Sequence, residues 1–293
     1  MDGHDCAVRS SSAHSLAPVG REDPPMRSTI AIPVTVHPTP EALGRTVAQR
    51  ILGGIERAAE ENRPYLLGCP AGRSVKPVFA ALGALAGMAR FDLSRLVLVM
   101  MDEYLGEGPD GPVLCDPRAH YSCRRFAEQE IRAVANAKLP GPCQLPAPGI
   151  WCPDPARPEA YDRRIRDAGG IDLFLLASGA SDGHVAFNPP GSAAEGATSI
   201  VVLAEETRRD NMATFPGFAA IAEMPRRGVS VGLGTIAGLS RAALMVIHGR
   251  HKRQAVRRLL ESRDFEPGWP ATILHRCRHP EIHLDAAAAR EAA

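Results

Sequence analysis

Short apolar runs alternate along the chain with segments in which apolar residues recur every three or four positions. The runs are rich in β-branched and aliphatic residues and predict strands at 29–36, 64–68, 96–101, 171–176, 201–203, 229–231 and 244–247. The segments between them predict amphipathic helices at 40–60, 74–88, 121–133, 157–167 and 250–262. Thr39 followed by Pro40 marks the start of the first helix. Strands that alternate with helices predict an α/β fold, a doubly wound, mostly parallel, Rossmann-like sheet with helices on both faces.

The run at 171–176 is the most informative of these, because a turn of small residues follows it and presents Asp182, Gly183 and His184. The run is almost entirely apolar, which is typical of a strand buried on both faces. In open α/β sheets, ligands bind in the crevice outside the carboxyl ends of such strands. An acid and a histidine at that place suggest proton transfer on a small molecule.

Two further turns carry polar groups at strand ends. The turn that includes Gly72, Arg73 and Ser74 joins a strand to a helix N-terminus, where free N–H groups attract anions. Ser74 could cap this helix or donate to a phosphate. Asp102 and Glu103 follow the strand at 96–101, and adjacent residues of an extended chain point to opposite sides, so we expect one of them to face the crevice.

Composition excludes several classes of function. The formal net charge of +1 over 293 residues gives no global field that favours nucleic acid or a membrane surface. The seven cysteines are scattered and form no CxxC pair, which argues against a disulfide framework or a cysteine-rich zinc site and favours a cytoplasmic protein. No apolar run approaches the roughly 18 residues that a membrane span needs.

The chain is expected to divide into an extension and one domain. Residues 1–27 contain acids, serines and prolines but no apolar stretch of a signal peptide, so we expect a mobile N-terminal extension. Residues 28–293 carry the alternating pattern and are expected to form a single α/β domain. The Pro-, Gly- and Cys-rich stretch at 139–155 is interpreted as a surface loop within that domain.

Seven motifs, in this order, resemble the glucosamine-6-phosphate deaminase/isomerase and 6-phosphogluconolactonase superfamily. They are LLGCPAGRSV (66–75), MMDEYLG (100–106), HYSCRRF (120–126), DGHVAFN (182–188), SVGLGTI (230–236), HGRHK (248–252) and ILHRCRHPEIHLD (273–285). MDEY and DGHxAFN are similar to the deaminase branch, whereas the lactonase branch is expected to show DER and a DGHTASLF-like segment.

The resemblance implies a role for each matching residue. Asp102 matches the acid that moves a proton between C1 and C2 of the open-chain sugar. His184 matches the histidine that helps to open the pyranose ring, and Asp182 matches its acidic partner. The turn with Gly72, Arg73 and Ser74 matches the phosphate-binding loop, and Lys252 matches a phosphate-binding lysine. The resemblance implies no metal and no organic cofactor.

The chain also departs from the family pattern. Pro189 stands where deaminases carry a glutamate that orients the ring-opening histidine, and Gly179 lies one place earlier than the usual glycine. Ala213 takes the place of a second phosphate-binding arginine. Arg73, Arg208 or Arg209 could compensate for that arginine, or each could be a solvated surface charge.

These features together predict an enzyme that carries out aldose–ketose isomerisation and deamination of a sugar 6-phosphate, with glucosamine 6-phosphate or a related amino sugar phosphate favoured. Two alternatives stay open, which are lactone hydrolysis of the 6-phosphogluconolactonase type and a non-catalytic sugar-phosphate sensor. The expected partner is a small-molecule sugar phosphate rather than nucleic acid or a membrane. The residues specify neither the sugar nor the oligomeric state, so a homo-oligomer is also open.

Overall fold

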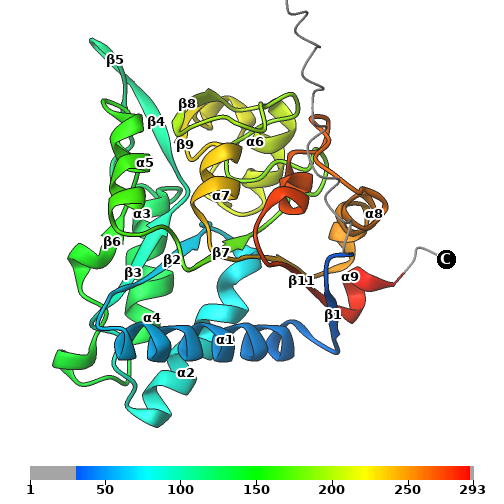
Figure 1. Cartoon of the computed structure of the whole chain (residues 1–293). Helices are drawn as coiled ribbons and strands as arrows, with labels where there is room; N and C mark the ends of the chain where they lie inside the picture. Colours follow the sequence, from blue (N-terminus) through cyan, green and yellow to red (C-terminus); the bar gives the residue numbers. More distant parts are fainter. Residues whose placement is uncertain (1–30, 291–293) are drawn as a thin grey trace, which may run out of the picture. The chain divides into compact units, whose positions relative to one another are not determined.

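The computed structural model describes residues 31–290, and a seven-stranded parallel sheet runs through it (Figure 1). The strand order is β1-β11-β10-β7-β2-β3-β6. The strands are β1 (Val34–His37), β2 (Tyr65–Cys69), β3 (Leu96–Met100), β6 (Ile150–Trp151), β7 (Leu173–Leu176), β10 (Ala243–Ile247) and β11 (Pro280–Asp285). The predicted strand at 29–36 therefore begins later, at Val34, and its first residues lie outside the described part. The mobile extension predicted at 1–27 lies outside it as well.

Helices cover both faces of this sheet, as predicted. The α-helices are α1 (Pro40–Glu60), α2 (Lys76–Ala89), α3 (Cys123–Phe126), α4 (Ala133–Asn136), α5 (Pro158–Asp167), α6 (Glu205–Met212), α7 (Leu233–Leu239), α8 (Arg253–Glu261) and α9 (Ala286–Ala289). A π-helix, η2 (Ala127–Arg132), joins α3 to α4 within the predicted helix at 121–133. The 3-10 helices are η1 (Arg73–Val75), η3 (Gly141–Cys143), η4 (Ala147–Gly149), η5 (Ile221–Glu223), η6 (Arg250–Lys252) and η7 (Pro270–Arg276). None of the described helices is long and apolar enough to span a membrane.

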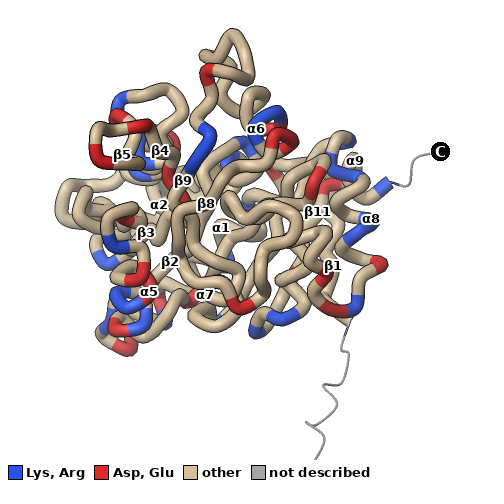
Figure 2. The backbone as a smooth tube through the Cα atoms, turned by 90° about the horizontal axis from the view of Figure 1, so that it is seen from above, with Lys and Arg blue, Asp and Glu red and all other residues tan. Residues whose placement is uncertain are grey.

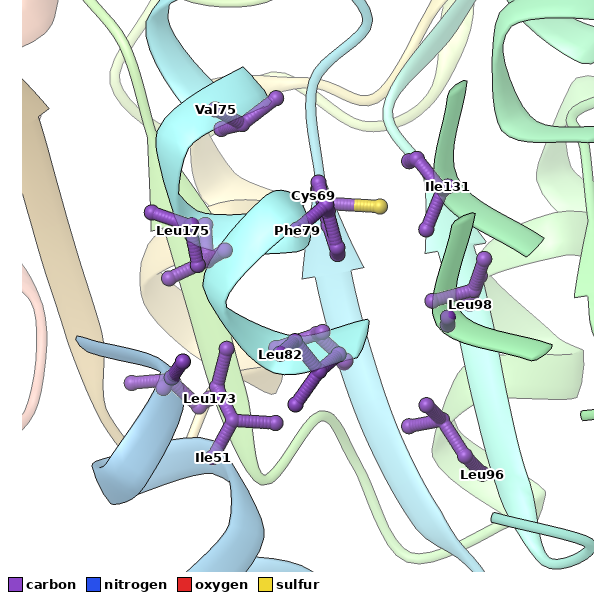
Figure 3. Close-up of a cluster of buried hydrophobic side chains, with 14 of the residues drawn as sticks. Ile51, Cys69, Val75, Phe79, Leu82, Leu96, Leu98, Ile131, Leu173 and Leu175 are labelled. Carbon is purple, nitrogen blue, oxygen red and sulfur yellow. The ribbon is translucent and has the colours of Figure 1, made fainter. Parts of the chain in front are cut away.

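Alternation along the central strands creates two hydrophobic cores, one on each face. Leu67 of β2 packs with α1, α2 and the α3–η2–α4 segment, and Figure 3 shows Phe79 and Leu82 of α2 in this core. Leu66, its neighbour, belongs to the opposite core with α5, α7 and α8. At the start of α1, Thr39 accepts a hydrogen bond from the backbone N–H of Ala42, as the sequence predicts for an N-cap.

A second sheet of four antiparallel strands corrects part of the sequence prediction. Its order is β5-β4-β9-β8, with β4 (Asp102–Gly108), β5 (Gly111–Leu114), β8 (Ser199–Val202) and β9 (Arg227–Ser230). The runs at 201–203 and 229–231 are strands, but they belong here rather than to the parallel sheet. Met101 links the two sheets, because its N–H donates to Cys69 of β2 and its carbonyl accepts from Val231, which follows β9.

The loop expected at 139–155 is more ordered than predicted. It contains η3, η4 and the short edge strand β6, which pairs with β3. Charged residues are interspersed in Figure 2, and in that view neither sign gathers on one side, in agreement with the near-neutral net charge.

Candidate active site

A pocket of about 490 Å³ lies at the carboxyl ends of β2, β3, β7 and β10, beside the start of β4. Its lining brings together three of the turns that the sequence singled out, which supply Arg73, Asp102 and His184. Lys252 reaches the same pocket from η6. This is the crevice in which ligands bind in open α/β sheets, and it is where the sequence places them.

The turn between β2 and α2 contributes Gly72, Arg73 and Ser74 to the lining. Gly72 has a φ of +124°, which a residue with a side chain rarely adopts. Ser74 forms no capping hydrogen bond to η1 or α2. Of its two predicted roles, capping is therefore wrong, and donation to a bound anion stays a prediction.

Asp102 is the buried carboxyl of the pocket, and the residue is only 5 % exposed. Its Oδ1 accepts a hydrogen bond of 3.3 Å from the thiol of Cys123. Burial raises the pKa of Asp102 to about 7, because the thiol hydrogen bond offsets only part of the desolvation and the carboxylate of Glu103 adds repulsion. The group can therefore both accept and donate a proton near neutral pH.

Glu103 points to the other side of β4, as expected for adjacent residues on a strand. Its carboxylate accepts hydrogen bonds from the backbone N–H groups of Cys123 and Arg124, at 2.9 and 2.8 Å, and from the hydroxyl of Ser122 at 2.9 Å. It thus satisfies free N–H groups at the start of α3. Glu103 fixes the segment that carries Cys123, and only Asp102 faces the pocket.

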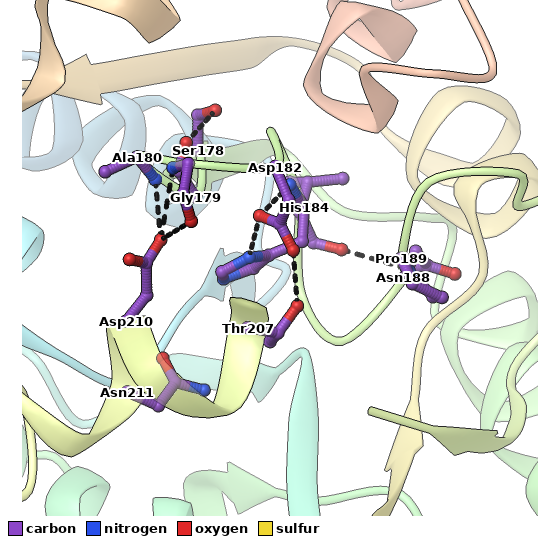
Figure 4. A network of polar contacts seen from close by, with 12 residues as sticks. Ser178, Gly179, Ala180, Asp182, His184, Asn188, Pro189, Thr207, Asp210 and Asn211 are labelled. Atoms are coloured by element: carbon purple, nitrogen blue, oxygen red, sulfur yellow. Dashed lines mark hydrogen bonds and ion pairs between the residues drawn. The ribbon is translucent and has the colours of Figure 1, made fainter. Parts of the chain in front are cut away.

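Asp182 and His184 form a hydrogen-bonded pair in the turn after β7 (Figure 4). The Nδ1 atom of His184 lies 2.7 Å from Oδ1 of Asp182, and the hydroxyl of Thr207 donates to Oδ2 at 2.6 Å. Burial alone would raise the pKa of Asp182, but the hydrogen bonds and charge of His184 and the bond from Thr207 lower it to about 2. With Nδ1 held by a carboxylate, Nε2 of His184 is the ring nitrogen available to a substrate oxygen.

Gly179 packs directly against this pair. A Cβ atom at this position would lie 2.3 Å from Nδ1 of His184 and 2.4 Å from Oδ1 of Asp182. The N–H of Gly179 donates to the carbonyl of His184 at 2.7 Å. The glycine that the sequence shows one place earlier than usual is therefore required by the close approach of the Asp182 and His184 side chains.

Of the basic residues near the site, Lys252 and Arg209 line the pocket and Arg208 does not. Lys252 donates from Nζ to the carbonyl of Ser178 at 2.5 Å, and burial lowers its pKa while the nearby Asp210 opposes that shift. Arg208 was predicted to bind phosphate, but its guanidinium turns away from the pocket and donates to the carbonyls of Ile221 and Met224. Its neighbour Arg209 lines the pocket instead.

Three pocket residues, His248, His251 and Asp210, were not predicted as site residues. The two histidines lie in the HGRHK motif, which the sequence singled out only for its lysine. Asp210 lies on α6, a mostly polar helix with the sequence EETRRDNM. The sequence singled out its arginines as candidate phosphate contacts but gave no signal for Asp210. Pro189 contributes no side-chain hydrogen bond to His184, and its carbonyl accepts from Ser192.

Within residues 31–290, one group of three side chains has atoms close enough together to hold a cation. An oxygen of Asp182, an oxygen of Asp210 and a ring nitrogen of His184 lie within 4.8 Å of one another. Hydrogen bonds already occupy both oxygens of Asp182 and one oxygen of Asp210. We therefore interpret the group as a hydrogen-bonded network and assign no metal ligand to it.

Comparison with known proteins identifies the family. A glucosamine-6-phosphate deaminase of Arthrobacter sp. (strain FB24) is 34% identical over 256 residues, which cover 87% of this chain and 91% of the relative. That of Mycolicibacterium smegmatis is 33% identical over 257 residues, covering 88% and 91%. The chain belongs to the glucosamine-6-phosphate deaminase family. The resemblance drawn from MDEY and DGHVAFN is thereby confirmed.

Solved structures agree with this family. A monomeric glucosamine-6-phosphate deaminase superposes with a TM-score of 0.73 at 25% identity, covering 88% of this chain and 99% of that one. A 6-phosphogluconolactonase of Shewanella baltica superposes with a TM-score of 0.63 at 14% identity, covering 87% and 98%, and shows that the fold is shared. No family model matches the chain. The chain is thus a deaminase-type enzyme on the fold that the deaminase family shares with the lactonases.

Proposed function

We propose that this chain converts glucosamine 6-phosphate, or a closely related amino sugar phosphate, into a ketose 6-phosphate and ammonia. The observation that carries the proposal is a single pocket that contains two groups suited to proton transfer. One is Asp102, a buried carboxyl whose pKa is about 7, and the other is His184, which is hydrogen-bonded to Asp182. Isomerisation of a sugar needs one group that serves both C1 and C2 and another that serves the ring oxygen. The two sets of side chains meet these needs with acids and bases alone.

His184 opens the ring in this proposal. Its Nε2 takes the proton of the C1 hydroxyl and returns a proton to the ring oxygen as the bond between C1 and that oxygen breaks. The product is the open-chain aldehyde. Asp182, bonded to Nδ1, stabilises the imidazolium that exists between the two transfers and keeps the ring in one orientation.

Asp102 acts on the open chain. Its carboxylate takes the proton from C2 while the C1 oxygen takes one from the substrate's ammonium group, and Asp102 then delivers its proton to C1. The nitrogen is left as an iminium group on C2, which water converts to a ketone with release of ammonium. A carboxyl whose pKa is about 7 suits this shuttle, because both of its protonation states are populated near neutral pH.

The phosphate binds, in this proposal, between the β2–α2 turn and η6. The turn offers Gly72, Arg73 and Ser74 near a helix N-terminus, and η6 offers Lys252. Free N–H groups and cations from two elements favour a dianion there. Arg73 takes over the charge of the arginine that Ala213 replaces, whereas Arg208 is committed to backbone carbonyls.

A coupled assay tests the proposal. The protein is incubated with glucosamine 6-phosphate and other sugar 6-phosphates, and ketose phosphate and ammonia are measured together in equal amounts. Faster hydrolysis of 6-phosphogluconolactone than turnover of any amino sugar would favour the lactonase alternative. Binding of sugar phosphates without any turnover would favour the sensor.

The cellular site belongs to the proposal as well. The cysteines within residues 31–290 carry free thiols, which is typical of a reducing compartment. We therefore place the enzyme in the cytoplasm, where a soluble sugar phosphate is its partner.

A further inference from the structure

One face of α6 lies against the turn that carries the catalytic pair. Thr207 and Asp210, three residues apart on this helix, both point to that turn (Figure 4). Thr207 donates to Asp182. One oxygen of Asp210 accepts from the N–H groups of Ala180 and Ser181, at 2.9 and 3.3 Å, and from the Ser181 hydroxyl at 3.0 Å.

The position of Asp210 also brings its carboxylate close to His184. An oxygen of Asp210, an oxygen of Asp182 and a ring nitrogen of His184 lie within 4.8 Å of one another, so the imidazole has two carboxylates close to it (Figure 4). Asp182 is bonded to Nδ1 of His184, and Asp210 is the second carboxylate near the ring. Within residues 31–290 the hydrogen bonds of Asp210 all involve Oδ2, and its Oδ1 makes none. Pro189, which stands where the resemblance implies a glutamate, offers neither charge nor a side-chain hydrogen bond.

We propose that Asp210 is a positioning residue for ring opening, which holds the turn of His184 and supplies the negative charge that Pro189 does not. A carboxylate beside an imidazole favours the protonated ring, which is the state that ring opening passes through. The inference rests on the proposed function, because it assigns a step of that reaction. Proton transfer between C1 and C2 through Asp102 does not depend on it.

A second interpretation of Asp210 has to be separated from this one. Arg73 and Lys252 face the same pocket, and the charge of Asp210 acts on Lys252 against the effects of burial and of Arg73. A carboxylate there could instead tune the phosphate-binding cations. That role would change KM for every sugar phosphate and would leave ring opening untouched.

The experiment compares two substrates in variants of the full chain. One substrate closes to a pyranose, and the other is an analogue that cannot cyclise because its 4- and 5-hydroxyls are blocked. Asp210→Asn keeps the size and an acceptor oxygen but removes the charge. We expect kcat on the ring-closing substrate to fall about tenfold and kcat on the analogue to stay unchanged. Asp210→Glu should restore part of the loss, and Glu206→Gln, an exposed charge change on the same helix, should have no effect.

A spectroscopic measurement makes the result independent of turnover. The NMR resonance of the Nδ1 proton of His184 is recorded in the ligand-free enzyme, where Asp210→Asn should move it and Glu206→Gln should not. Equal losses on both substrates, or a change in KM alone with an unmoved resonance, would overturn the role of Asp210. If the parent enzyme turned over no amino sugar, the proposed function would fail, while the resonance would still decide whether Asp210 acts on His184.

Discussion

Replacing Asp102 by asparagine is expected to make the protein more stable and nearly inactive at the same time. The substitution keeps the size of the side chain and an oxygen that can accept from the thiol of Cys123, but it removes the base. General acid–base catalysis typically contributes about 10²–10⁴-fold, so we expect kcat to fall by that factor while sugar-phosphate binding survives.

The gain in stability follows from the pKa of Asp102, which is about 7 in the folded protein, whereas its ordinary value is 3.8. A carboxyl with a raised pKa binds its proton more tightly in the folded state, so the free energy of unfolding falls as pH rises from the ordinary pKa to the raised one. Three pKa units, at about 1.4 kcal/mol each, give an upper bound of about 4 kcal/mol. Because the substituted asparagine does not titrate, the advantage of Asp102→Asn should grow by about 2–3 kcal/mol between pH 5 and pH 8.

Urea unfolding of both proteins at pH 5 and pH 8, with kcat measured in parallel, tests this reasoning. Asp182→Asn is the matched control, since Asp182 is also buried but its pKa is lowered to about 2. Its ionised form stabilises the fold at pH values above about 4, so this variant should lose about 2 kcal/mol at pH 8. The reasoning about Asp102 fails if the stability difference is the same at both pH values, and near-normal turnover would make Asp102 a structural acid.

Three further predictions concern the pair and the phosphate. Gly179→Ala should lower kcat by about 10²-fold without unfolding the protein, because the added methyl would displace His184. The control is Gly238→Ala in α7, where a Cβ meets nothing within 4 Å. Equal activity of the two variants would refute the argument. Lys252→Ala should raise KM more than it lowers kcat, since the phosphate is remote from the reacting carbons; a loss in kcat alone would speak against an anchor. Arg73→Gly should also raise KM, and an unchanged value would return Arg73 to ordinary surface charge.

The parallel sheet and the candidate catalytic side chains could be predicted because their signals are local. Buried strands such as β7 are continuous apolar runs, and the polar residues directly after them must lie at the carboxyl edge of the sheet. Asp102, Asp182 and His184 follow from this rule, and the structure brings Asp102 and His184 to one pocket with Asp182 bonded to the histidine.

The second sheet and the contribution of α6 could not be predicted in the same way. The sequence of β4, DEYLGEG, shows no regular alternation, and its pairing with β9 joins residues more than a hundred positions apart. On α6 each residue is rotated by about 100° from the one before it, so Arg208 reaches backbone carbonyls while Arg209 and Asp210 reach the pocket. Only the position of this polar helix on the fold decides which of its charges face the substrate.

The part that the sequence did not predict is also the part that gives Asp102 its chemistry. At Met101 the chain leaves the parallel sheet and enters the antiparallel one, so Asp102, the first residue of β4, lies buried where the two sheets meet and pairs with Ser230 of β9. Burial has the largest effect on the pKa of Asp102, and the negative charge of Glu103, which is held at the start of α3, raises that pKa further. A carboxyl at an exposed strand end would stay solvated, would keep a pKa near its usual value, and would be ionised at neutral pH. The junction of the two sheets therefore raises the pKa of a common carboxyl to about 7.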